Sequence, residues 1–155
     1  MAGSVKLAGK VVPAEKREVF KVLGSSLGMT IGNAMESATQ IKRGLSFQKL
    51  FQFQRTSQLP LEAIAKVLRL PKRTAARRKK EGRLSPAESE RLVRLSLLFE
   101  KATNLFEGDK AAALIWLNKP SKAFGQTSPL VMAETEMGAR AVEDLIGQLE
   151  HGVFV

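Results

Sequence analysis

The apolar positions of this chain recur at helical spacing over most of its length. Residues 33–44 (NAMESATQIKRG) and 46–57 (SFQKLFQFQRTS) each begin with a polar residue that can cap a helix, Asn33 and Ser46 respectively. No segment shows a convincing alternation of apolar and polar residues, which is typical of a half-buried strand. We therefore predict an all-α fold.

Two short helices separated by a tight turn are predicted between residues 60 and 83. The first has one apolar face, which is formed by Leu61, Ile64, Ala65 and Leu68. After a break at Arg69 and Leu70, Pro71 suits the first position of the second helix, where its missing N–H would have no partner. Gly82 ends that second helix. Such a pair is the helix-turn-helix arrangement.

The clearest helix follows directly and runs from Ser85 to Gly108. Ser85 is a suitable N-cap, Pro86 suits the first position, and Glu88 completes a capping box. The apolar residues of this helix cover more than one stripe, so it is either central in its domain or packs on another chain. We consider two partners for it: a second subunit, or the helix at 47–53 of the same chain.

Three further helices are expected in the C-terminal part. Residues 110–120 (KAAALIWLNKP) hold Trp116, which is expected to anchor a core. A loop containing Gly125 leads to a helix that starts at Ser128 and Pro129, and the last helix runs from a Thr135 cap to Gly152. Residues 1–32 give the weakest signal, with one short helix expected at 14–23.

Composition narrows the chemistry that the chain can perform. The 155 residues include no cysteine and one histidine, His151, so disulfides, thiolate metal sites and multi-histidine metal sites are excluded. The sequence has no phosphate-binding glycine motif and no run of about 18 apolar residues. It also lacks a secretory signal pattern. We expect a cytoplasmic protein that is not an enzyme.

The net charge of +10 is unevenly distributed. Residues 66–83 contain nine basic residues and one acidic residue, a net charge of +8. Residues 84–155 contain seven basic and ten acidic residues, a net charge of −3. A basic block beside a mildly acidic half indicates two surfaces with two kinds of partner.

The second helix of the predicted helix-turn-helix pair is a candidate for DNA binding. A helix-turn-helix reads bases with the N-terminal residues of its second helix, so the candidates for base contacts are Lys72, Arg73 and Arg77. The candidates for phosphate contacts are Thr74, Arg78, Lys79 and Lys80. The alternative is a solvated cationic face or a general polyanion patch, although self-repulsion disfavours an isolated helix of this composition.

Three blocks of the sequence, in this order and spacing, resemble one family. They are RTAARRKKEGRLSPAESERLVRL, then AAALIWLNKP, then FGQTSPLVMAETEMGARAVEDLIGQLEHGV. From about Gly44 onward the chain resembles the Xre/MbcA/ParS-type antitoxins, the partners of RES-domain toxins in bacterial type II toxin–antitoxin systems. The family pattern has two glycines before the Pro-Leu pair, whereas here Gly125 is followed by Gln126.

The resemblance implies a helical, usually dimeric protein with two tasks and no cofactor. Its helix-turn-helix half binds the promoter of its own operon, and its C-terminal half covers the active site of a toxin that destroys NAD. The domains are then an undefined segment at 1–32, a DNA-binding region at 33–84, and a toxin-binding and dimerisation region at 85–155. The toxin-facing candidates implied by the resemblance are Gly138, Arg140, Glu143, Leu149, Glu150, His151, Gly152, Val153 and Phe154.

Charge suggests how the C-terminal end acts on such a toxin. Because sites that bind NAD phosphates tend to be basic, we hypothesise that Glu150 or the carboxylate of Val155 occupies the phosphate site of the toxin. Two other hypotheses remain open: a repressor whose C-terminal half only dimerises, and a toxin-binding protein whose basic helix holds phosphates without reading sequence.

Overall fold

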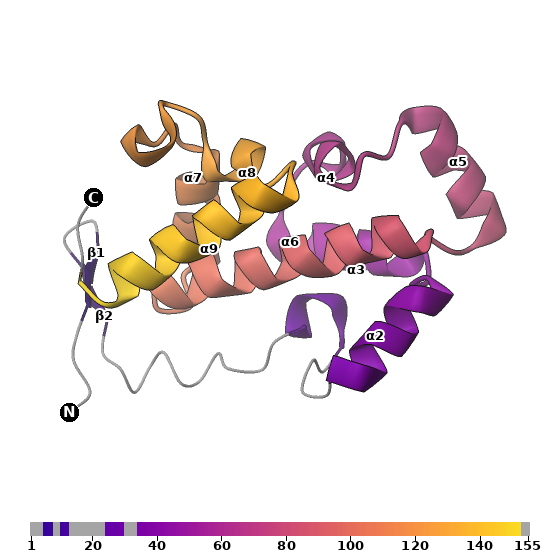
Figure 1. The fold of residues 1–155 in the computed structure, drawn as a ribbon, viewed down its shortest axis with the longest axis horizontal. Coiled ribbons are helices and arrows are strands. Elements are labelled where there is room, and N and C mark those ends of the chain that lie inside the picture. The colour runs from indigo at the N-terminus through magenta and orange to yellow at the C-terminus, as the bar shows by residue number, and fades with distance from the viewer. Residues whose placement is uncertain (1–4, 8–9, 13–23, 30–33, 153–155) are drawn as a thin grey trace. The chain divides into compact units, whose positions relative to one another are not determined.

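The computed structural model describes residues 5–7, 10–12, 24–29 and 34–152, and most of them lie in helices (Figure 1). The elements in chain order are β1 (Val5–Leu7), β2 (Lys10–Val12), the 3-10 helix η1 (Ser25–Leu27), α2 (Ala34–Arg43), α3 (Gln48–Ser57), α4 (Leu61–Leu68), α5 (Lys72–Glu81), α6 (Pro86–Leu105), α7 (Lys110–Asn118), the 3-10 helix η2 (Lys122–Phe124), α8 (Pro129–Met132) and α9 (Glu136–Glu150). The predicted all-α class is confirmed.

Two short strands were not expected from the sequence. Strands β1 and β2 pair antiparallel, with Val5 opposite Val12, and β1 contacts α9. Each strand has three residues, which is too short for an alternating pattern to stand out. The helix expected at 14–23 and the cap expected at Asn33 lie outside the described residues.

The chain forms two compact units, and their division falls inside α6. One unit spans 22–97, and the other joins 1–21 to 98–155. The boundary predicted from the sequence, at 84/85, lies before this helix. The two parts of the helix have different partners: Arg91 donates to the carbonyl of Leu68, the last residue of α4, at 3.1 Å, whereas Lys101 pairs with Glu143 of α9 at 3.1 Å.

Helix α6 starts at the capping box that the sequence indicates. The hydroxyl of Ser85 accepts from the amide of Glu88 at 3.1 Å, and the amide of Ser85 donates to the Glu88 carboxylate at 2.9 Å. Nearly all of its apolar residues are buried within the chain: Leu92, Val93, Leu95, Leu98, Phe99, Ala102 and Leu105. Because its apolar surface is already covered, the structure favours a central helix over a dimer surface.

In unit 22–97, backbone hydrogen bonds join the segment before α3 to the segment after α5, at the C-terminal end of α5. The amide of Phe47 donates to the carbonyl of Gly82 at 3.0 Å, and the amide of Leu84 donates to the carbonyl of Leu45 at 2.9 Å. The amide of Leu45 also donates to the Ser89 hydroxyl at 2.8 Å. Helix α3 starts at Gln48, and Ser46, the predicted cap, accepts only a long 3.4 Å bond from the Gln48 amide.

The turn between α4 and α5 is as short as predicted. Arg69 takes the left-handed conformation, with φ 53°, and the amide of Leu70 returns to the carbonyl of Ala65 at 2.9 Å. Pro71 is extended and is the N-cap of α5. The helix therefore begins at Lys72, one residue after the predicted start at Pro71. Gly82 ends α5 with φ 81°.

In unit 98–155, helix α8 contacts both α7 and α9. The caps are those that the sequence indicates: Ser128 accepts from the amide of Val131 at 3.3 Å, and Thr135 accepts from the amide of Gly138 at 3.0 Å. Trp116 packs against Phe106 with 6.4 Å between ring centroids, which agrees with its expected structural role.

The loop between α7 and α8 contains a strained position. Gly125 and Gln126 are both left-handed, with φ 58° and 69°, and the amide of Gln126 donates to the carbonyl of Ser121 at 2.8 Å. Gln126 is the residue at which the chain departs from the two-glycine family pattern. A side chain in this conformation is disfavoured relative to glycine.

We predict that Gln126→Gly raises the free energy of unfolding by about 1 kcal/mol, because glycine adopts this backbone conformation without a steric penalty. Urea denaturation of the full chain measures the effect. Gln126→Ala is the matched control and should leave stability nearly unchanged, since it keeps the Cβ atom. If both variants gain the same stability, the loss of the Gln126 side chain causes the gain, and the backbone conformation does not.

Candidate functional site

Helix α5 presents its cations to solvent. None of its residues is buried, and Lys72, Arg73, Arg77, Lys79 and Lys80 are exposed, whereas Thr74 is half-buried. Arg77 lies 3.9 Å from Glu81 in an ion pair whose arginine side chain is 62 % exposed. The ammonium of Lys79 lies 5.6 Å from the centroid of the Phe51 ring. These five cations are therefore accessible to an anionic partner.

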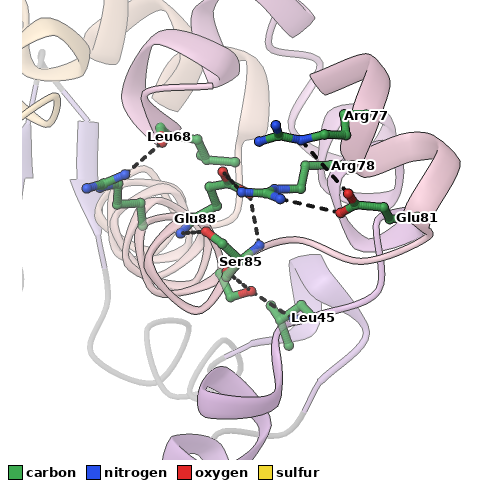
Figure 2. Close-up of polar contacts among 9 residues, drawn as sticks. Leu45, Leu68, Arg77, Arg78, Glu81, Ser85 and Glu88 are labelled. Atoms are coloured by element: carbon green, nitrogen blue, oxygen red, sulfur yellow. Dashed lines mark hydrogen bonds and ion pairs between the residues drawn. The ribbon is translucent and has the colours of Figure 1, made fainter. Parts of the chain in front are cut away.

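Arg78 differs from the other cations of α5 because it is held by two carboxylates (Figure 2). Its Nε donates to Glu88 at 2.8 Å, and its Nη1 donates to Glu81 at 3.3 Å. The side chains of Arg78 and Glu88 are 20 % and 8 % exposed. Arg78, a predicted phosphate contact, joins α5 to the start of α6 in the structure.

Both partners of this ion pair have shifted pKa values. Burial alone would raise the pKa of Glu88, but the hydrogen bonds from Arg78 and Ser85 outweigh it and lower that pKa. The hydrogen bond to Glu88 raises the pKa of Arg78. The ionised form of Glu88 is therefore more favourable in the folded state than in the unfolded chain.

A lowered pKa makes part of the stability depend on pH. The contribution of Glu88 is present above the pKa of an unfolded glutamate, about 4.3, and is lost as the pH falls through the lower folded value. We predict that Glu88→Gln is less stable than wild type at pH 7 and that the difference narrows below pH about 4. Urea denaturation across this range tests it, and a constant difference would contradict it.

A shallow hollow of about 450 Å³ opens at the turn between α4 and α5. Its residues are Glu62, Ala65, Lys66, Arg69, Leu70, Pro71 and Lys72. Lys66 and Arg69 were not among the predicted DNA contacts, although the tight turn in the sequence placed them beside the start of α5. They add two exposed cations to this end of the basic surface.

The predicted toxin-facing residues are divided between packing and exposed positions. Gly138 is buried, Glu143 pairs with Lys101 at 3.1 Å, and Arg140 is exposed and pairs with Glu136 at 2.9 Å. Leu149 and Glu150 are half-buried, and His151 and Gly152 are exposed. Val153, Phe154 and Val155 lie outside the described residues.

Three exposed apolar residues of unit 98–155 were not predicted as site residues. They are Ile115, Val131 and Met137. A signal was present for Met137, because the predicted buried face of α9, which includes Val142 and Ile146, leaves Met137 on the other side of the helix.

No group of three or more His, Asp or Glu side chains among the described residues could hold a metal ion. Over the same part of the chain, every helix is too short or too polar to cross a bilayer.

Comparison with known proteins gives two family matches, one that includes the basic surface of α5 and one that includes the predicted toxin-facing residues of α9. Residues 36–96 match the Antitoxin Xre-like helix-turn-helix domain, and residues 101–152 match the Antitoxin Xre/MbcA/ParS C-terminal toxin-binding domain. The chain is 36 % identical to Antitoxin Xre of Yersinia enterocolitica over 86 % of this chain and 91 % of that protein. It is 30 % identical to Antitoxin Xre of Photorhabdus laumondii over 86 % and 93 % of the two chains.

A third relative, Antitoxin Xre of Pseudomonas putida, is 32 % identical over 54 % of this chain and 52 % of that protein. The fold and these matches define an antitoxin with a helix-turn-helix domain. The chain belongs to the Xre family of antitoxins, and its two surfaces correspond to a DNA-binding and a toxin-binding domain.

Proposed function

We propose that this antitoxin represses its own promoter through α5 and neutralises a RES-type, NAD-degrading toxin by covering its active site. On this proposal it acts as a homodimer in the bacterial cytoplasm, is not an enzyme and uses no cofactor. The observation that carries the proposal is one chain with a solvent-exposed cationic second helix and a separate unit that matches a toxin-binding domain.

The DNA-binding part rests on the exposure and position of the cations of α5. Lys72 and Arg73 are the first two residues of the helix, the end that reads bases in helix-turn-helix proteins, and Arg77 follows Arg73 after four residues on the same face. Lys79 and Lys80 lie in the last turn, where phosphate contacts are expected. Since Arg78 is paired with Glu88, we assign it no phosphate contact in this proposal.

A gel-shift titration on the promoter region at several salt concentrations tests this assignment. Lys79→Ala should weaken binding to all DNA similarly. The slope of the logarithm of the binding constant against the logarithm of salt concentration should become shallower by about one, which corresponds to one phosphate contact. Arg77→Ala should instead reduce the preference for the promoter over unrelated DNA. If wild type shows no preference, α5 only holds phosphates and autorepression is refuted.

The toxin-binding part rests on the family match and on charge. Residues 129–152 contain five acidic residues and one basic residue, a net charge of −4. Such a segment complements the basic pocket that an NAD-degrading enzyme needs for the phosphates of its substrate. Glu150, near the end of α9, is the proposed occupant of that pocket.

Co-expression with the toxin of the adjacent reading frame tests this part. The wild-type chain should preserve cellular NAD, and deletion of residues 150–155 should restore NAD loss. Full neutralisation by the truncated chain would rule out the terminal plug. If the chain and the adjacent product do not associate, the alternative of a repressor whose C-terminal half only dimerises is favoured.

A further inference from the structure

Large apolar side chains are exposed mainly in the C-terminal unit. Of the four among the described residues, Ile115 on α7, Val131 on α8 and Met137 on α9 are 67 %, 51 % and 83 % exposed. The fourth, Met35, belongs to unit 22–97 and is 79 % exposed. Exposed apolar residues that lie together mark an interaction surface more often than a single exposed residue does.

The three residues come from helices that pack on one another. Helix α8 contacts both α7 and α9 (Figure 1). The contact between α8 and α9 is close, because Gly138, the neighbour of Met137, lies against the carbonyl of Met132, the neighbour of Val131. One partner surface can therefore cover residues from all three helices.

Helix α9 adds charged groups beside the apolar ones. Met137, Arg140 and Asp144 follow each other at three- and four-residue spacing and are all exposed, so they share one face. On this face Arg140 is paired with Glu136 at 2.9 Å. Apolar contacts with a charged border are the usual anatomy of a protein interface.

We propose that the toxin docks on this α7–α9 surface, with Ile115, Val131 and Met137 as the apolar contacts and Glu136, Arg140 and Asp144 beside them. The inference rests on the proposed function and deepens it, because it adds a docking surface on α7–α9 to the contact proposed for Glu150. All six residues lie within the part that matches the toxin-binding domain.

The family match favours the toxin over a second copy as the occupant, because the model that matches residues 101–152 is that of a toxin-binding domain. A twofold dimer would instead place the same surface of both copies together, and the oligomeric state would then change with it. Charge does not separate the two occupants, since residues 110–152 contain five acidic and four basic residues.

The test compares polar substitutions of these residues in the full-length chain. Met137→Gln, Ile115→Gln and Val131→Thr should each weaken binding to the purified RES-type toxin of the adjacent reading frame about five- to tenfold. The triple variant should weaken binding at least about a hundredfold. Met35→Gln is the matched control and should leave toxin binding unchanged. Promoter binding should be unchanged in all variants.

The outcomes separate this inference from the proposed function. If wild type binds the toxin and the folded triple variant binds equally well, the surface assignment is overturned. A changed oligomeric state with unchanged toxin affinity assigns the surface to a second copy and also overturns it. If the wild type does not bind the toxin, the proposed function fails and this inference with it. If the triple variant does not fold, the toxin affinity of Met137→Gln alone tests the surface, because that side chain is 83 % exposed and its substitution should not affect folding.

Discussion

Gly138→Ala is expected to lower the free energy of unfolding by roughly 2–4 kcal/mol. A methyl group at this position would overlap the carbonyl oxygen of Met132, which is backbone and cannot rotate away. It would also lie 2.9 Å from the hydroxyl of Thr135, which caps α9 by accepting from the Gly138 amide. The start of α9 must therefore move away from α8, and the cap is strained as it moves. Urea denaturation measures the loss.

Gly147→Ala in the same helix is the matched control. A Cβ atom at Gly147 would meet nothing within 4 Å, so this variant should gain up to about 1 kcal/mol from helix propensity. The resemblance placed Gly138 among the toxin-facing residues, but its burial indicates an effect on the toxin through packing. If Gly138→Ala is as stable as wild type and still fails to neutralise the toxin, Gly138 acts by direct contact.

The sequence predicts the helix caps of this fold but not the packing between its helices. The capping box of Ser85 and Glu88 and the Thr135 cap are recognisable because each pair lies within three residues. The close approach at Gly138 depends on how α8 meets α9 in space. The sequence does not say which atoms lie against a glycine inside a helix. From the sequence alone, Gly138 and Gly147 are therefore expected to tolerate substitution equally.

The candidate site shows the same limit. The cations of α5 were predicted as one group because they share a short segment of similar composition. The structure separates Arg78 from this group through Glu88, ten residues further along the chain. Lys66 and Arg69 join the basic surface only because the turn after α4 brings them beside Lys72. Spacing along one helix predicts neither arrangement, since both depend on a second helix.

Glu88→Ala is expected to lower the free energy of unfolding by roughly 2–4 kcal/mol at neutral pH. The substitution removes the acceptor of the Ser85 amide and leaves Arg78 with only its longer contact to Glu81. Glu81→Ala is the matched control, because Glu81 is half exposed and should change stability by less than about 0.5 kcal/mol.

Promoter binding by Glu88→Ala and Arg78→Ala distinguishes a positioning role of Arg78 from a phosphate contact. Because Glu88 and Arg78 join α5 to α6, their loss should weaken promoter binding by loosening the orientation of α5. The salt dependence of binding should stay that of wild type, since neither residue neutralises a phosphate. Lys79→Ala should lower the salt dependence at nearly constant stability. If Arg78→Ala lowers the salt dependence as Lys79→Ala does, Arg78 contacts DNA directly, and the ion pair seen in the structure breaks on binding.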